Sequence, residues 1–436
     1  MTKYAAIREL HRLKVFIIIS LGQFVSIVGS GLTSFALDLW VYQQTGSVTQ
    51  YALIGLFNLV PPILISPIAG AFVDRWDRRW TMIISDFVAA LATLFIALLF
   101  FTSRLQVWYI CAAISVISVC NLFQRLASTT ATTLLVPKKH LGRASGILQI
   151  GESITELFIP ALAGILVLTI QLQGIFLIDF ITYFFSLATL LIVKFPKLKT
   201  TAKTTKSDQG IGSLISDLVY SWNYTIKYPG LLGLLLYFAI TNFIIGTISI
   251  LLIPMLLTFV SSATAGSILS IGGIGTLVGS LLMGIWGGPK RSIYGILGFG
   301  MLLGVCIFSG GLRPSTTLIT ASIFGGLFCF TLIAGCSEAL LLRKVAPDVQ
   351  GRVFALMGMI TSSSVPLAYL LAGPLADYVF EPLLANGGLL AGSVGSIIGV
   401  GKGRGIGLLF IVLGILQITA TIYSYLYPHL KKLDPG

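Results

Sequence analysis

The sequence predicts an all-α membrane protein in which twelve transmembrane helices form two pseudo-repeated six-helix bundles. Hydrophobic residues make up 56% of the 436 residues and charged residues only 10%, so the chain lacks the polar groups needed to cover a soluble core. Long apolar runs alternate with short basic loops, and turn sequences recur about 210 residues apart. Because the basic residues sit in these short loops, the net charge of +13 reports membrane topology and excludes nucleic acid as a partner.

Six helices are expected in the first half, followed by a polar linker. The helices are expected at about 15–43, 51–72, 82–101, 107–135, 144–168 and 174–194. Residues 1–14 carry four basic side chains and are expected to lie at the inner membrane surface. In the linker, apolar residues from Ile211 to Ile226 recur at i, i+3 and i+4, which indicates an amphipathic helix along the same surface.

The second half repeats the pattern and fixes the expected orientation. Its helices are expected at about 230–258, 265–287, 293–311, 316–343, 352–378 and 406–427. The predicted domains are therefore 1–194, a cytoplasmic linker at 195–229, and 230–436. With the N-terminus inside, 23 of the 28 Lys and Arg residues lie on the inner side and four in outer loops. This asymmetry predicts that both termini face the cytoplasm. The expected location is the plasma membrane, which in a bacterium is the inner membrane.

Neither a metal nor a cofactor is expected. The five cysteines all fall inside apolar runs, and none is spaced with a histidine as metal ligands are. The stretch Gly401–Gly405 lacks the Ser or Thr and the preceding strand of a phosphate loop, so no nucleotide is expected. The expected partners are the lipid bilayer and a small amphipathic substrate, and the chain is expected to be a monomer.

Short sequences relate the two halves. A Pro followed by Gly-Arg at 137–143 recurs at 347–352, and the pair Ala-Gly at 163–164 recurs at 372–373. A repeat of two six-helix halves is typical of transporters whose substrate path lies between the halves.

A charged hairpin at 70–79 separates two apolar runs and reads Gly-x-x-x-Asp-Arg-x-x-Arg-Arg. It resembles the loop between helices 2 and 3 of major facilitator superfamily transporters, except that Asp77 replaces a usual glycine. An ordinary basic inner loop is the alternative. Further stretches resemble, in the same order, the drug:proton antiporter branch of that family, which includes macrolide and siderophore exporters; they lie at 37–47, 136–144, 176–179, 228–231 and 349–353. The resemblance covers nearly the whole chain.

This resemblance implies the major facilitator fold and a secondary active transporter. It implies a proton-coupled exporter of an amphipathic drug, macrolide or other natural product, working by alternating access on the proton gradient. A siderophore or lipid carrier of the same fold is one alternative. A membrane-embedded enzyme is another, and the isolated histidines and scattered cysteines argue against it. The resemblance also implies a cytoplasmic gate at the hairpin, in which the acid lies near the start of helix 11; the gate residues are Gly70, Asp74, Arg75, Arg78 and Arg79.

Ionisable residues inside the predicted spans are the candidates for coupling. Each costs about 3 kcal/mol or more at mid-membrane unless it meets a partner or a wet cavity. Arg125, Glu152 and Glu156 fall at nearly one depth, 12 to 16 residues from the turn near His140. We interpret them as a proton or substrate site in the cavity, and a static ion pair between two helices is the alternative.

Four further ionisable residues lie in the spans. Asp38 and Glu338 complete the candidate coupling and cavity set. The alternative to a cavity role for Glu338 is an ion pair with Arg343. Asp86 lies near the inner end of its predicted helix and Asp179 near the outer end of its own, and structural roles are expected for both.

Overall fold

Helices make up the regular secondary structure of the described part of the chain. The computed structural model describes residues 2–136, 155, 157–192, 226–344 and 350–431. Within these residues, 11 helices are long and apolar enough to cross a membrane, and a shorter apolar helix spans Leu157–Thr169. The predicted all-α membrane fold is thereby confirmed. The first part of the predicted span at 144–168, and the predicted amphipathic helix at 211–226 except for its last residue, lie outside the described residues.

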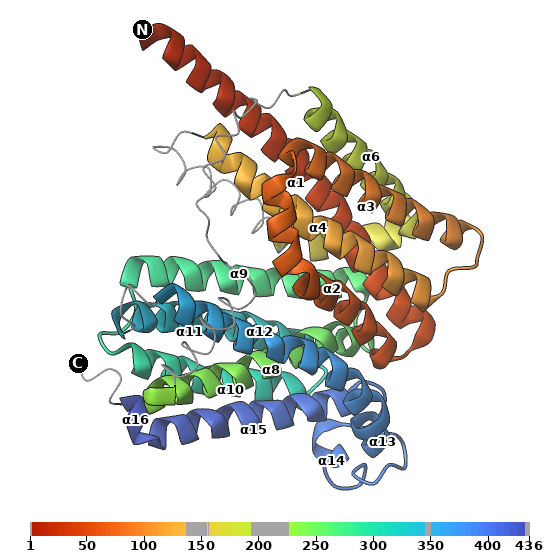
Figure 1. The fold of residues 1–436 in the computed structure, drawn as a ribbon. Coiled ribbons are helices and arrows are strands. Elements are labelled where there is room, and N and C mark those ends of the chain that lie inside the picture. Colours follow the sequence, from red (N-terminus) through yellow and green to blue (C-terminus); the bar gives the residue numbers. More distant parts are fainter. Residues whose placement is uncertain (1, 137–154, 156, 193–225, 345–349, 432–436) are drawn as a thin grey trace. The chain divides into compact units, whose positions relative to one another are not determined.

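The chain divides into two compact units (Figure 1). The first unit comprises Met1–Lys199 and Ser262–Ser270, and the second comprises Thr200–Ser261 and Ile271–Gly436. The first unit contains the helix at Leu157–Thr169 and five longer helices: α1 (Thr2–Thr45), α2 (Val48–Arg75), α3 (Arg78–Phe101), α4 (Val107–Leu135) and α6 (Gln171–Ile192).

The second unit contains the remaining helices. Its long helices are α8 (Pro229–Leu257), the larger part of α9 (Ser262–Trp286), α10 (Ser292–Leu312), α11 (Thr316–Lys344), α12 (Gln350–Pro374) and α15 (Arg404–Leu426). Its short elements are the π-helix η2 (Leu375–Phe380), α13 (Glu381–Leu383), α14 (Gly395–Ile398) and α16 (Pro428–Lys431). The π-helix directly follows Pro374, which lacks the N–H that would continue the regular α-helical ladder.

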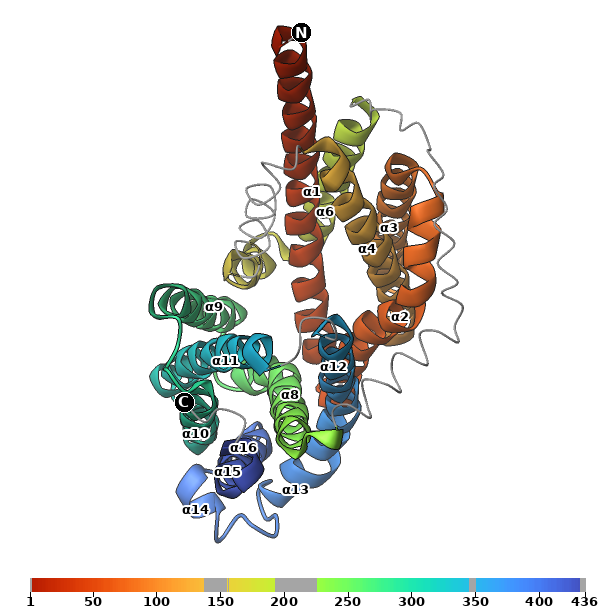
Figure 2. The same cartoon turned by 60° about the vertical axis from the view of Figure 1, so that its left-hand side comes forward.

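Antiparallel packing of α1 against α6 organises the first unit, and both views show these helices side by side (Figures 1 and 2). Two glycines of α1, one heptad apart, make the close approach possible. A Cβ at Gly22 would collide with the side chain of Thr189, and a Cβ at Gly29 would collide with that of Thr182. The two helices are therefore held at a distance that a larger side chain would not permit.

The basic N-terminal segment differs from its prediction. The sequence suggests a separate segment at the membrane surface over residues 1–14, whereas the structure continues α1 without interruption from Thr2 to Thr45. No proline or glycine occurs before Gly22, so nothing in the sequence ends the helix at the membrane boundary.

Candidate functional site

The charged hairpin is built as a tight connection between two helices. The α2 helix ends at Arg75 and α3 begins at Arg78, so only Trp76 and Asp77 lie between them. The Asp77 carboxylate caps α3, because its Oδ1 accepts hydrogen bonds from the backbone N–H groups of Arg79 (2.9 Å) and Trp80 (3.4 Å). The turn does not require a glycine at position 77, because φ there is −68°, a value that any residue adopts, and an aspartate can therefore serve as the cap.

The last arginine of the hairpin binds the end of another helix of the first unit. Arg79 Nε donates to the backbone carbonyl of Leu190 at 2.9 Å, and Nη2 donates to that of Leu191 at 2.8 Å. The side chains of Asp74 and Arg75 lie outside the described ones, so the gate role predicted for the hairpin, Gly70 included, stays a prediction.

The predicted coupling residues are only partly described. Arg125 on α4 and Glu338 on α11 have exposed side chains, and Asp38 on α1 is half-buried. Glu152 and Glu156 lie outside the described residues, so their predicted proximity to Arg125 stays a prediction. Glu338 and Arg343 are both exposed and form no ion pair within the described part of the chain. The alternative pairing of Glu338 with Arg343 is therefore not seen there.

The structure instead reveals a buried carboxylate, Asp86 of α3, that is hydrogen-bonded to two other helices and linked through one of these partners to a third. Asp86 is 6% exposed. Its Oδ2 accepts hydrogen bonds from Ser186 Oγ of α6 (2.8 Å) and Gln23 Nε2 of α1 (3.3 Å). Gln23 Nε2 also donates to Ser186 Oγ at 2.8 Å, and Gln23 Oε1 accepts from Gln124 Nε2 of α4. This set, Gln23–Asp86–Gln124–Ser186, is the Asp86 network.

A second buried acid lies two turns further along the same α1–α6 interface. Asp179 of α6 is 1% exposed. The Ser30 hydroxyl of α1 lies 3.3 Å from Asp179 Oδ1 and 3.0 Å from the Tyr183 hydroxyl. Asp179 Oδ2 is buried without a hydrogen-bond partner among the described residues. The sequence places both acids on the correct helices but does not indicate their partners, because Gln23, Ser30 and Ser186 are ordinary polar residues within apolar runs.

The equivalent interface of the second unit is polar but neutral. Gln417 of α15, fully buried, donates from Nε2 to Tyr237 OH (3.2 Å) and Thr241 Oγ1 (3.3 Å) of α8. The Tyr237 hydroxyl also lies 3.4 Å from Thr421 Oγ1. Gly300 of α10 faces this group, since a Cβ at Gly300 would collide with the Tyr237 hydroxyl.

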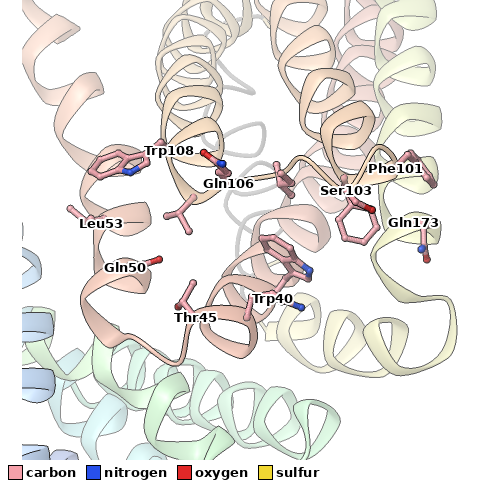
Figure 3. Close-up of a pocket in the computed structure, with 13 residues that line it drawn as sticks. Trp40, Thr45, Gln50, Leu53, Phe101, Ser103, Gln106, Trp108 and Gln173 are labelled. Carbon is pink, nitrogen blue, oxygen red and sulfur yellow. The ribbon is translucent and has the colours of Figure 1, made fainter.

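A pocket of about 840 Å³ opens where α1 passes into α2, α3 passes into α4, and α6 begins (Figure 3). Aromatic rings and side-chain amides dominate its lining, which includes Trp40, Phe100, Phe101, Trp108, Gln44, Gln50, Gln106 and Gln173. Trp40 packs edge-on against Phe100, with ring centroids 6.0 Å apart. None of the 13 lining residues is charged. The pocket can therefore offer stacking surfaces and neutral hydrogen-bond groups to a ligand, but no counter-ion.

Backbone N–H groups at the glycine-rich loop, residues 401–405, are hydrogen-bonded by a carboxylate of the same chain. The Glu381 carboxylate accepts hydrogen bonds from the backbone N–H groups of Gly403 (3.2 Å) and Ile406 (3.1 Å), at the start of α15. The positive end of this helix is thus already occupied by an anionic group. Among the described residues, no cluster of metal-ligating side chains occurs, and all five cysteines are free.

Comparison with known proteins identifies relatives of this chain. A family model described as Major Facilitator Superfamily matches residues 19–369. Macrolide efflux protein A of Streptococcus pyogenes is 27% identical over 364 residues, which are 82% of this chain and 88% of that protein. Its namesake in Enterococcus faecalis is 28% identical over 72% of this chain and 96% of that protein. The multidrug efflux pump Tap of Mycolicibacterium fortuitum is 24% identical over 80% of this chain and 86% of that protein.

Solved structures share the fold. A bacterial homolog to the human lysosomal transporter Spinster, in an inward-facing and unoccupied conformation, superposes with a TM-score of 0.70 at 14% identity, covering 97% of this chain and 98% of that one. The nucleoside transporter NupG superposes with a TM-score of 0.68 at 13% identity, covering 95% and 99%. At these identities the likeness establishes the architecture alone.

Proposed function

Because this chain belongs to the Major Facilitator Superfamily, we propose that it exports an amphipathic small molecule in exchange for protons. Its family and its structural neighbours are transporters, so the chain is a multi-pass membrane transporter and not an enzyme. The observation that carries the direction and the cargo class is the similarity, along about four-fifths of the chain, to proteins named for macrolide and multidrug efflux.

The pocket of the first unit supports a cargo with little net charge. Its rings and amides suit a molecule that combines apolar surface with hydroxyl or carbonyl groups. A strongly charged substrate would lose its hydration there without meeting an opposite charge. The proposed coupling and cavity residues remain Arg125, Glu152, Glu156, Asp38 and Glu338. Both termini are proposed to face the cytoplasm of a bacterial inner membrane.

The test is a transport assay in a bacterial host that lacks its own efflux pumps. Cells expressing this chain should accumulate less radiolabelled erythromycin, a macrolide, than cells carrying an empty vector. A protonophore should abolish the difference. Equal accumulation in both strains would contradict macrolide export, and an iron–siderophore or fluorescent lipid analogue would then test the alternative cargoes. A difference that survives the protonophore but collapses with the sodium gradient would contradict proton coupling.

A further inference from the structure

Asp86 and Asp179 are two buried carboxylates that have only neutral hydrogen-bond partners. Both lie along the seam between α1 and α6 of the first unit, and no Lys or Arg among the described residues pairs with either. An ionised carboxylate is costly to bury unless a cation accompanies it. Protonation removes that cost, so each position favours a group that can gain and lose a proton.

The partners of both acids allow either protonation state. Ser186 donates to Asp86 Oδ2, and Ser30 lies within hydrogen-bonding distance of Asp179 Oδ1. A hydroxyl is both donor and acceptor and rotates freely, so each serine can donate to a carboxylate or accept from a carboxylic acid. Proton uptake therefore reverses the direction of these hydrogen bonds without breaking them. A lysine or arginine in the same place would hold the acid permanently ionised.

The second unit shows that a seam of this kind does not need an acid. The α10 helix begins 214 residues after α3, and α9 begins 214 residues after α2. With this offset, Gln23 corresponds to Tyr237 and Asp86 corresponds to Gly300. The seam between α8 and α15 is joined by Tyr237, Thr241, Gln417 and Thr421, all neutral. Because neutral groups hold the helices together there, helix packing alone does not explain the acids of the first unit.

The Asp86 network also reaches the helix that carries a proposed coupling residue. Gln23 Nε2 donates to Asp86, and Gln23 Oε1 accepts from Gln124 of α4. Gln124 directly precedes Arg125, whose side chain is exposed. A change in the charge of Asp86 therefore acts on an amide that is bonded to α4. Among the described residues, the other titratable groups that interact electrostatically with Asp86 are Cys120 of α4 and Tyr183 of α6, and Tyr183 also interacts with Asp179.

We propose that Asp86 and Asp179 are proton-binding sites of the first unit, and that the Asp86 network transmits proton binding to α4 through Gln23 and Gln124. The inference rests on the proposed proton coupling and names a site for it within one unit. Asp86 lies eight residues from the start of α3, and Asp179 lies eight residues from the start of α6. The two acids are about two helical turns apart along the α1–α6 seam, with Asp86 nearer the end of the unit where α3 begins and Asp179 nearer the end where α6 begins. Each acid is therefore placed to exchange protons with a different membrane face.

Infrared difference spectroscopy tests proton binding without any substrate. In reconstituted wild-type protein, spectra recorded at acidic and alkaline pH should differ in the carbonyl stretch of a protonated, buried carboxylic acid. Asp86→Asn and Asp179→Asn should each remove one component of that band. Asp77→Asn, which changes the exposed aspartate that caps the helix carrying Asp86, is the matched control and should remove none. A spectrum that is identical in wild type and both buried-site variants would overturn the proposal.

Transport separates this inference from the proposed function. In proteoliposomes, erythromycin exchange driven by a pH gradient should be lost in Asp86→Asn, while the thermal unfolding temperature stays near that of wild type because asparagine keeps the hydrogen bonds. If exchange by the wild-type protein does not depend on the pH gradient, the proposed coupling is refuted, and the infrared result on proton binding is unaffected. Gradient-driven exchange that is normal in Asp86→Asn would refute the inference alone.

Ser186→Ala keeps the acid and removes its reversible partner. This variant should shift the pH range over which the Asp86 component changes, because the ionised carboxylate loses a donor. It keeps the test decisive if an asparagine variant fails to fold. An unshifted Asp86 component in Ser186→Ala would count against the network.

Discussion

Arg79 of the charged hairpin donates a hydrogen bond to the main-chain oxygen of Leu190, in the last turn of α6. The Nε–O distance is 2.9 Å, and a second bond to Leu191 measures 2.8 Å. The last carbonyls of a helix have no partner within the helix, so this guanidinium satisfies two of them. The family resemblance implied a gate residue at this position. The structure adds a binding role for the same side chain inside the first unit.

The contact predicts that Arg79→Gln lowers the stability of the protein. Loss of charge-assisted hydrogen bonds from a partly exposed site should cost about 1–2 kcal/mol. Thermal unfolding in detergent, followed by intrinsic fluorescence, measures the change. Arg78→Gln is the matched control, because Arg78 Nε has no hydrogen-bond partner among the described residues. Equal losses in both variants would show that the α6 contact contributes nothing specific.

The N-cap at Asp77 predicts an unusual order among substitutions. Asp77→Ala removes the acceptor for two backbone N–H groups and should cost about 0.5–2 kcal/mol, whereas Asp77→Gly should cost only a few tenths. Glycine is also the residue that the family usually has here, so the departure from the motif replaces one acceptable cap by another. The unfolding temperatures of the two variants, compared with that of wild type, measure this order of stability. If Asp77→Gly were the less stable of the two, the cap would not be the reason for aspartate.

The sequence predicts the spans well because a bilayer imposes a simple rule on length and hydropathy. The α3 helix, predicted at 82–101 and found at Arg78–Phe101, illustrates this. Interfaces between helices follow no such rule. Gln23 and Ser186 lie far apart in sequence, and only the packing of α1 on α6 brings them to Asp86. The sequence does not predict the pocket for the same reason, since its aromatic rings and amides come from five separate helix ends, none of which has a distinctive motif.

The uncharged pocket predicts a binding defect in Trp40→Ala. Removing one stacking surface should raise the KM for erythromycin up to about tenfold with little change in kcat, because an aromatic contact contributes about 0.5–1.5 kcal/mol. Initial rates of uptake into inverted membrane vesicles measure both constants. Trp80→Ala, an exposed tryptophan of α3 outside the pocket, is the control and should leave both unchanged. An unchanged KM in Trp40→Ala would exclude this pocket from the transport path.

The distribution of basic residues predicts the orientation of the chain. A cysteine introduced at Ser207 should react with a membrane-impermeant maleimide only from the cytoplasmic side, and one at Ser393 only from the outer side. Ser393 is exposed, and the five native thiols are buried or half-buried, so the background is low. Wild-type protein labelled in parallel supplies that background. Reaction of both positions from one side would refute the twelve-span topology.

The final prediction concerns Arg125, Glu152 and Glu156 as the coupling centre. They are expected at one depth on adjacent helices, where one acid can neutralise the arginine. Two carboxylates one helical turn apart resist joint ionisation, which leaves the second acid free to bind a proton in competition with cargo. Glu152→Gln and Glu156→Gln should therefore reach normal membrane levels yet lose pH-dependent efflux of erythromycin.

A static ion pair predicts the opposite pattern for the same three residues. A cation left alone in the membrane is costly, so each single variant, including Arg125→Gln, would then lower the amount of protein in the membrane. The double variant Arg125→Gln/Glu156→Gln removes both charges and would restore amount and efflux together. Quantitative immunoblots and efflux at several external pH values distinguish the two cases. Full recovery of efflux in the double variant would make the pair structural, and Asp86 and Asp179 would then stand as the proposed proton-binding sites of the first unit beside the candidate Asp38.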